Sequence, residues 1–329
     1  MQPQFDSYET IREFRVDNIN RYKLHPHTLN EFHDQLMRSA SELALLHVQK
    51  EYGEPPCRYT WFVMGSGGRN EQGLISDQDH GLVYEEHSER AARFFSKLGA
   101  ELSKGLHEIG YPYCEGKIMS SNSMWCKSLR DWDAQLYSWM DDKSWESIRY
   151  LQIFYDGRAL IGDPSFIIQL KKLIIDYQSR EKHLLHRFLD NIQHIKPSVG
   201  PLGQIYVELQ GPYEGCIDWK KAAFLPYVNA IRLLSIKEGL YQTGTLERMN
   251  ELIAKNEGYQ ELKHYRDNFI LLLEYRTSLY TKADSYDDVH YLNIKELSRE
   301  QKRQVKYLLK DGKKIHQLVQ GIINKGCIS

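Results

Sequence analysis

Cysteine is scarce in this chain of 329 residues, which contains five, an odd number. No two of them have the C-x-x-C spacing, so the sequence argues against a disulfide framework and against a zinc knuckle. This usage is typical of proteins that fold in a reducing compartment. We therefore expect a cytoplasmic location.

Long apolar runs and an excess of charge of one sign are also missing. No run of about 18 apolar residues occurs, and the first residues are polar with mixed charge, so we expect neither a membrane span nor a signal peptide. The 43 Lys and Arg nearly balance the 44 Asp and Glu. Bulk charge thus predicts no attraction to nucleic acid or membrane, and we expect neither DNA nor a membrane as a partner.

The chain is longer than a single hydrophobic core comfortably supports, which favours two domains. Residues 1–27 are expected to be an N-terminal extension. Residues 28–163 mix apolar strands with amphipathic helices, and residues 164–329 have mostly helical periodicity. The predicted fold class is α+β, a mixed-sheet domain followed by a C-terminal helical bundle.

Local patterns predict the elements of the first domain. A capping box of Thr28 and Glu31 predicts a helix that runs to about Tyr52. Ser88 is expected to cap a second helix, which ends at Gly110. The segments "RYTWFVMG", "HGLVYE" and "YPYCEGKIM" are predicted strands because they are rich in aromatic and β-branched residues or precede turn glycines.

In the second half, a helix is expected from about Pro164 to Tyr177, and the last helix is expected to begin at a capping box of Ser298 and Gln301. The segment "GQIYVELQGPYEGCIDWKKA" interrupts the helical pattern. It is either a short hairpin or an extended loop.

The stretch "GSGGRNEQGLISDQDHGL", residues 65–82, directly follows the first predicted strand. It fails as a Walker A loop because no lysine follows its glycines. It also fails as a dinucleotide fingerprint, since Asn70 stands where the third glycine belongs. What remains is a Gly-Ser turn, ten further residues, and Asp-x-Asp leading into a strand.

This layout indicates a site for metal and phosphate. In an extended segment residues two apart point to the same side, so Asp77 and Asp79 can present two carboxylates to one Mg²⁺ or Mn²⁺ ion. The turn Gly65, Ser66, Gly67, Gly68 permits close approach of backbone N–H groups to the phosphates of a nucleoside triphosphate, and Arg69 adds a cation. Alternation turns His80 away from this side.

The stretch resembles the signature of the DNA polymerase β-type nucleotidyltransferase superfamily, a Gly-Ser turn followed by Asp-x-Asp. Its longer form is similar to one branch, the bacterial nucleotidyltransferase-like proteins related to the N-terminal domain of the PII uridylyltransferase. The segments "YCEGKIMSSNSMW", "FYDGRALIGD" and "FLPYVNAIRLLSIKEGLYQTGTLERMNEL" resemble the same branch, including its helical substrate-binding C-terminal domain. The CBS or cyclic-nucleotide-binding modules common in that branch have no counterpart in this sequence.

The resemblance implies a Mg²⁺-dependent enzyme that transfers UMP or AMP from an NTP to a protein or small-molecule acceptor and releases pyrophosphate. It places Gly65 and Ser66 on the phosphate turn, and Asp77 and Asp79 on the catalytic metal ligands. The third metal carboxylate of the superfamily has no clean match. Glu115 and Asp156 are both open as candidates.

Other polar and aromatic residues are possible substrate contacts, each with a structural alternative. Glu71 is expected either to pair with Arg69 or to orient a metal-bound water. Asp156 and Arg158 are expected either to form a buried ion pair that braces the two domains or to face the cleft. The remaining candidates for sugar, base or acceptor contacts are Asn122, Trp125 and Lys127.

The unplaced third carboxylate supports a rival hypothesis, a catalytically inactive protein of the same fold that binds a nucleotide and signals through its helical domain. A weaker alternative is a toxin-like transferase neutralised by a partner. Mg²⁺-dependent transfer from an α-labelled NTP distinguishes an enzyme from the inactive regulator.

Overall fold

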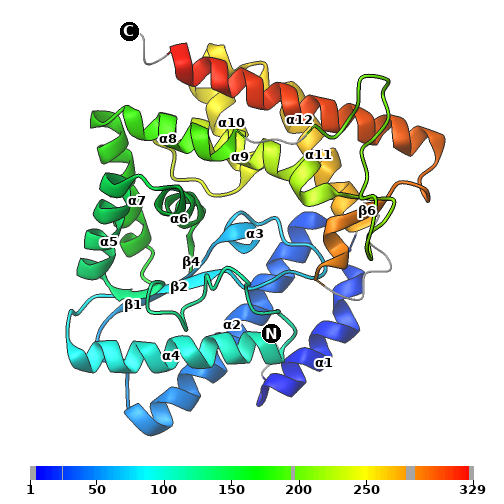
Figure 1. Ribbon diagram of the computed structural model, residues 1–329. Helices are drawn as coiled ribbons and strands as arrows, with labels where there is room; N and C mark the ends of the chain where they lie inside the picture. The colour runs from blue at the N-terminus through cyan, green and yellow to red at the C-terminus, as the bar shows by residue number, and fades with distance from the viewer. Residues whose placement is uncertain (1–4, 24, 194–196, 279–285, 326–329) are drawn as a thin grey trace. The chain divides into compact units, whose positions relative to one another are not determined.

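The computed structural model describes residues 5–23, 25–193, 197–278 and 286–325. Its contacts divide the chain into two compact units, one that ends at Ile174 and one that begins at Ile175. The first contains a mixed sheet with helices, and the second is largely helical (Figure 1). The predicted fold class is confirmed.

A four-stranded sheet forms the centre of the first unit, in the order β3-β2-β1-β4. β1 pairs antiparallel with both β2 and β4, whereas β2 and β3 are parallel. The two strands predicted on either side of the glycine-rich stretch are confirmed as neighbours. The bounds are β1 Tyr59–Val63, β2 His80–Tyr84, β3 Cys126–Ser128 and β4 Arg158–Gly162.

Helices α2 (Pro26–Tyr52) and α4 (Glu89–Glu108) cover one face of this sheet (Figure 1). Helix α1 (Tyr8–Asn18) packs with them, and its Tyr8 and Ile11 side chains are buried in the same hydrophobic cluster. The segment expected to be an extension thus contributes to the core of the first unit. Burying these two side chains favours docking of α1 by about 1.5–3 kcal/mol each.

Helices α5 (Leu129–Asp142) and α6 (Trp145–Tyr155) pack on the opposite face. There Phe62 of β1 meets the rings of Trp132 and Phe154 edge-on, with centroids 5.8 Å apart in each pair. Because helices cover both faces, the central strands β1 and β2 are largely apolar, whereas the edge strand β3 is Cys-Lys-Ser. Helix α7 (Ser165–Arg180) follows β4.

The third predicted strand is wrong. Residues 111–119 contribute only an isolated bridge to Gln78, and the carbonyls of Pro112 and Ile118 accept hydrogen bonds from the start of β2. Pro112 has no N–H to donate, and a turn from Cys114 to Lys117 breaks the extension. The remaining two strands of the sheet are β3 and β4. The sequence did not predict them, because β3 has only three residues and β4 shows little alternation of polar and apolar residues.

The capping predictions have different outcomes. Ser88 accepts from the N–H of Ala91 at 3.2 Å, as predicted for α4. The box of Thr28 and Glu31 is wrong, because α2 begins at Pro26, whose preset φ and missing N–H suit the first helical position.

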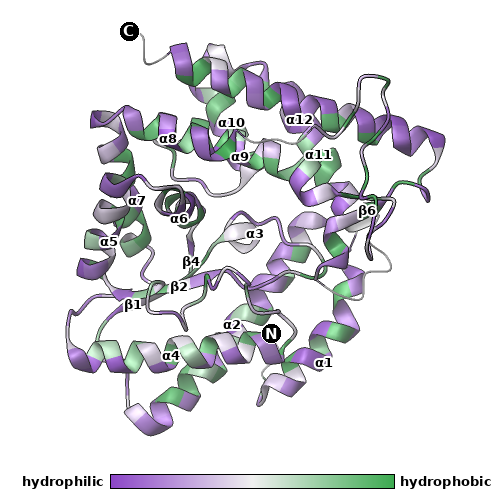
Figure 2. Ribbon diagram, viewed as in Figure 1, coloured by the Kyte–Doolittle hydropathy of each residue, from purple (hydrophilic) through white to green (hydrophobic). Residues whose placement is uncertain are grey.

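Over its described residues, the second unit contains five helices of ten residues or more and one short strand pair. Helix α9 is its centre, with apolar side chains around most of its circumference, whereas α12 has one apolar stripe and a polar outer face (Figure 2). The box of Ser298 and Gln301 that opens α12 is confirmed, with reciprocal bonds of 3.1 and 2.8 Å. The bounds are α8 His183–Ile192, α9 Leu225–Glu238, α10 Thr245–Lys255, α11 Leu262–Ser278 and α12 Arg299–Lys325.

The interrupting segment of this unit closes a loop on itself, since the N–H of Glu208 donates to Cys216 O at 2.8 Å and the N–H of Gly215 donates to Glu208 O at 2.9 Å, but it contains no strand pair of its own among the described residues. Its strand β5 (Cys216–Asp218) pairs antiparallel with β6 (Tyr291–Asn293), more than seventy residues later. A π-helical turn, η2 (Lys220–Phe224), then leads into α9. The other short turns are η1 Ile19–Arg21, η3 Glu257–Tyr259 and η4 Asp288–His290. Within the described ranges, no helix has both the length and the apolar composition that crossing a membrane requires.

Candidate functional site

The glycine-rich stretch begins with a single helical turn, α3 (Gly65–Gly68), placed directly at the end of β1. Gly65 has φ +54°, which reverses the chain as it leaves the strand. The N–H of Gly68 donates to Met64 O at 2.7 Å and begins the helical bonding pattern. The preceding amides, from Gly65 to Gly67, belong to a first turn, whose N–H groups lack intrahelical partners and suit anionic oxygens.

The second aspartate lies directly against this turn. A Cβ atom placed on Gly65 would come within 2.1 Å of Asp79 Oδ2, so the position accepts only glycine while the carboxylate stays where it is. The backbone adds a second link, since the N–H of Met64 donates to Asp79 O at 2.8 Å. The two halves of the motif are therefore in van der Waals contact.

Asp77, Asp79 and Cys114 form a group of metal-ligand type. One donor atom from each lies within 4.8 Å of the other two. Both aspartates are partly exposed, and the thiol is buried. Burial, followed by the charges of Asp79 and Asp77, raises the pKa of the Cys114 thiol well above its usual range. The group therefore offers two carboxylates and one thiol as donor groups.

This donor set fits a divalent cation in part. Two converging carboxylates are the ligands that Mg²⁺ and Mn²⁺ take in proteins, whereas a thiol is a softer ligand than either prefers. Sequence reasoning missed Cys114, although it pointed to Glu115 beside it. The spacing of the cysteines bears only on disulfides and zinc knuckles, and no local pattern indicates that residue 114 reaches the aspartates.

Neither candidate for the third carboxylate belongs to this group among the described residues. Glu115 is exposed on the turn that follows Cys114. Asp156 is completely buried at the C-cap of α6. Its Oδ2 accepts from Arg69 Nη1 at 2.7 Å.

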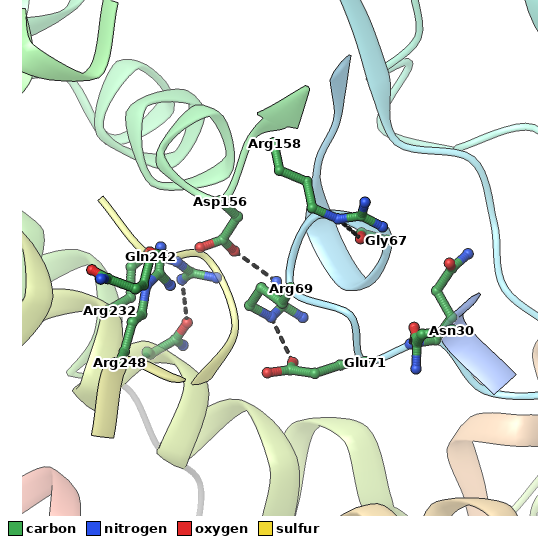
Figure 3. Close-up of polar contacts among 11 residues, drawn as sticks. Asn30, Gly67, Arg69, Glu71, Asp156, Arg158, Arg232, Gln242 and Arg248 are labelled. Carbon is green, nitrogen blue, oxygen red and sulfur yellow. Dashed lines mark hydrogen bonds and ion pairs between the residues drawn. The ribbon is translucent and has the colours of Figure 1, made fainter. Parts of the chain in front are cut away.

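Arg69 lies between two buried carboxylates. Its Nε donates to Glu71 Oε2 at 2.7 Å, and its Nη1 holds Asp156, as Figure 3 shows. Burial would lower the pKa of the guanidinium, but Glu71 and then Asp156 outweigh burial and raise it. The expected pair of Arg69 with Glu71 is confirmed. With Nε and Nη1 occupied, Arg69 is a brace at the end of α3.

Arg158 clamps the same turn from β4. Its Nε donates to Gly67 O at 3.0 Å, while its two terminal nitrogens bind the Asp34 carboxylate at 2.8 and 2.5 Å. The prediction of an ion pair between Asp156 and Arg158 is therefore wrong. Asp156 pairs with Arg69, and Arg158 pairs with Asp34. Gly68 allows the tight fit, since a Cβ there would come within 2.1 Å of Asp156 O.

His80, one residue beyond Asp79, is buried and points away from the aspartate group. Trp61 Nε1 donates to its Nδ1 at 3.0 Å, and its Nε2 lies 3.0 Å from Gln78 Oε1. These partners match a neutral ring with its proton on Nε2. Burial lowers the pKa of His80 to about 3. Its predicted orientation, away from the metal side, agrees with these contacts.

The remaining candidates lie in the segment before β3. Asn122 is engaged locally, because its Nδ2 donates to Lys117 O at 3.1 Å and its Oδ1 accepts from the N–H of Met124 at 3.0 Å. Trp125 is fully buried against Trp132, as a core residue is. Lys127 is half-buried within β3.

Comparison with known families agrees with this geometry. A model described as putative nucleotidyltransferase DUF294 matches residues 10–146, which include the glycine turn and all three donor residues. Its companion, described as a putative nucleotidyltransferase substrate binding domain, matches residues 182–323. The chain belongs to this nucleotidyltransferase-like family. A search of curated proteins gives no match.

The family match identifies the chain, at a coarse level, as a nucleotidyltransferase-like protein with a helical C-terminal domain. The expected resemblance is thereby confirmed at the level of the family. The matched ranges end and begin on either side of Ile174, where the two compact units divide.

Proposed function

We propose that this protein is a metal-dependent nucleotidyltransferase that moves UMP or AMP from a nucleoside triphosphate to an acceptor, a protein or a small molecule, and releases pyrophosphate. The contact of the Asp79 carboxylate with Gly65 carries the proposal. It brings an anion-binding turn and a cation-binding carboxylate to the same point, which is what a triphosphate bound with its metal requires.

Asp77 and Asp79 would hold a Mg²⁺ or Mn²⁺ ion, with Cys114 beside it. Such an ion supplies charge neutralisation at the α-phosphorus and on the departing pyrophosphate. The amides of α3 and the Ser66 hydroxyl orient the outer phosphates. A nucleophilic oxygen or nitrogen of the acceptor forms a bond to the α-phosphorus, and the bond from that phosphorus to the pyrophosphate oxygen breaks.

The braces around the turn give this site its rigidity. Arg69 holds the C-terminal end of α3 through Glu71 and Asp156, and Arg158 holds its middle through Gly67 O. Because these side chains are fixed before substrate arrives, the amides need little reorganisation on binding. Arg69 then acts on the nucleotide indirectly, by positioning the turn.

The decisive experiment measures transfer from α-³²P-labelled UTP or ATP, with Mg²⁺ or Mn²⁺, to proteins and metabolites of a cell extract. We expect metal-dependent labelling of an acceptor, lost when Asp77→Asn and Asp79→Asn are combined. Absence of any nucleotide binding by the wild-type chain would falsify the proposal.

A matched pair of glycine variants tests the contact itself. Gly65→Ala places a methyl group on the Asp79 carboxylate, whereas Gly53→Ala adds a methyl group at φ +76° with nothing within 4 Å. Both changes carry backbone strain, about 1–3 kcal/mol at Gly53, where ψ is −164°. Only Gly65→Ala should weaken NTP binding, by about tenfold or more, and equal affinities in the two variants would contradict the assigned contact.

The donor set itself favours a second candidate function, a nucleotide-binding regulator without transferase activity, because among the described residues a thiol and not a third carboxylate stands beside Asp77 and Asp79. A thiol is a poor substitute for a carboxylate as a ligand of Mg²⁺ or Mn²⁺. Tight NTP binding without turnover across nucleotides, metals and acceptors would identify this regulator. Restoration of turnover by Cys114→Asp would locate the defect at this ligand.

A further inference from the structure

A cavity of about 470 Å³ lies within the helical unit. Its walls come from the end of α8, the segment before β5, the turn η2, the start of α9, β6 and α12. All of these elements follow Ile175, so the cavity belongs to this unit alone. Its volume falls in the range of sites that bind small organic molecules.

One buried polar atom in the lining lacks a partner. His316 of α12 is 6 % exposed, and among the residues that the structure describes no group hydrogen-bonds to its Nε2. The backbone of Ile192 bonds to this imidazole and tends to raise its pKa, as a carbonyl that accepts from the ring does. Burial outweighs this and lowers the pKa of His316, which favours the neutral ring. With the proton on Nδ1, Nε2 offers a lone pair to a donor.

The charged residues of the lining leave it with a negative balance. Lys221 Nζ lies 2.9 Å from Asp218 Oδ2, and the N–H of Lys221 donates to Asp218 Oδ1 at 2.9 Å. These two residues therefore neutralise each other. Glu208 is the further charged residue among those described in the lining, and its side chain is exposed. A carboxylate or phosphate ligand would meet this charge unfavourably.

The walls combine aromatic and aliphatic side chains with polar ones, which include Asn191, Ser198 and Asn229. The ring of Tyr291 stacks on Tyr213 with centroids 3.7 Å apart and planes 3° apart, and the buried Ile217 lies on the paired strand β5. The turn η2 is π-helical, a form that is rare and often found at functional sites. A flat or aliphatic body can therefore be enclosed without reordering these walls.

We propose that this cavity binds a small organic molecule with an apolar body and a hydroxyl or amino group that donates to His316 Nε2, and that it discriminates against anions. The cavity is formed by the helical unit alone. The inference therefore stands whether or not the first unit transfers a nucleotide.

The test uses the full chain and a matched series of probes, in which phenyl, cyclohexyl and butyl bodies each carry an ethanol, ethylamine, propanoate or plain ethyl group. Binding is measured by ligand-observed NMR and calorimetry. For at least one body, the alcohol or amine should bind about tenfold more tightly than the ethyl compound, and the carboxylate should bind no better than the ethyl compound. Failure of all twelve probes to bind, or preference for the carboxylates, overturns the proposal.

Variants of His316 identify the acceptor. His316→Leu should abolish the preference for alcohol or amine over the ethyl compound, since it removes the Nε2 acceptor. It also removes the bond between the ring and the backbone of Ile192, so a lower Tm is expected and binding is compared at a temperature where the variant is folded. His316→Gln, which can offer an amide oxygen, should keep part of the preference. His183→Leu, at an exposed histidine of α8, should leave binding unchanged. A preference that survives in His316→Leu overturns the assignment.

A matched pair of variants tests the effect of charge on ligand binding in the cavity. Glu208→Gln should raise the affinity for the carboxylate probes, whereas Glu214→Gln, at an exposed residue outside the lining, should not. An equal response in the two variants rejects the assigned role of Glu208. NTP binding measured on the same variants should match that of the wild-type chain, so that the outcome at this cavity is separate from the outcome at the glycine turn.

Discussion

Each unit buries an aspartate, but the two are stabilised by different groups. Asp156 of the first unit is fully buried and bonds to the charged guanidinium of Arg69. Asp311 of the helical unit is 2 % exposed, and its oxygens bond to uncharged donors, Tyr227 at 3.0 Å and Asn268 at 2.6 Å. His264 Nε2 lies 3.1 Å from its other oxygen.

The difference follows from what surrounds each carboxylate. The first unit places four carboxylates, those of Glu71, Asp77, Asp79 and Asp156, around one turn, and a fixed cation offsets part of that charge. Among its described residues, the helical unit has one buried carboxylate, which joins α9, α11 and α12 and which neutral hydrogen bonds can satisfy. Carboxylates are thus concentrated at the glycine turn, whereas the helical unit buries one carboxylate and the guanidinium groups of Arg232 and Arg248.

The largest loss of stability should come from removing the guanidinium group of Arg69. Arg69→Leu deprives two buried carboxylates of the guanidinium they share, so the free energy of unfolding should fall by about 3–5 kcal/mol. Arg58 is the matched control because it also binds two carboxylates, Glu85 at 2.6 Å and Asp163 at 2.9 Å, but is 62 % exposed. Urea unfolding should show a much smaller change for Arg58→Leu, since water screens exposed pairs. Similar losses of unfolding free energy in the two variants would contradict the expected difference between buried and exposed ion pairs.

A smaller effect is expected at Asp311. Asp311→Ala leaves Tyr227 and Asn268 without their acceptor and should cost about 2–3 kcal/mol. Asp311→Asn keeps an oxygen at the same place and should cost less than the alanine variant. This order, measured by urea unfolding, would support stabilisation by neutral hydrogen bonds. If the asparagine variant were as unstable as the alanine variant, the charge itself would be required, as in the first unit.

The smallest effect concerns acid stability of the helical unit. Burial, followed by the charges of Lys220 and Arg276, lowers the pKa of His290 to about 3. Between that value and about 6.5 the unfolded chain binds the proton and the folded chain does not, so this histidine makes stability rise with pH and fall on acidification. Because His290 is partly exposed, its share should be less than about 1.4 kcal/mol per pH unit.

His290→Gln should flatten the dependence of unfolding free energy on pH from 6.5 down to 4. His183→Gln, at an exposed position of α8, should keep the wild-type dependence. If the two variants gave the same pH profile, His290 would not be the group responsible.

Much of the fold was predictable because its evidence is local. The two strands around the glycine-rich stretch, the helix capped by Ser88 and the box of Ser298 and Gln301 each depend on residues a few positions apart. The wrong strand at 111–119 had suitable side chains, but its backbone bonds go to the start of β2 and to a turn. Strand β4 was missed because pairing with β1, about a hundred residues earlier, is what makes it a strand.

The sequence by itself determined the glycine turn and the aspartate pair, since glycine's freedom at positive φ and the two-residue repeat of extended backbone are properties of short segments. Only the tertiary structure decided that Cys114 joins the aspartates and that Arg69 is a brace. It also decided that His316 lines a cavity. Their partners lie far along the chain, and burial, which sets the cost of an unpaired charge or polar atom, exists only after the units have packed.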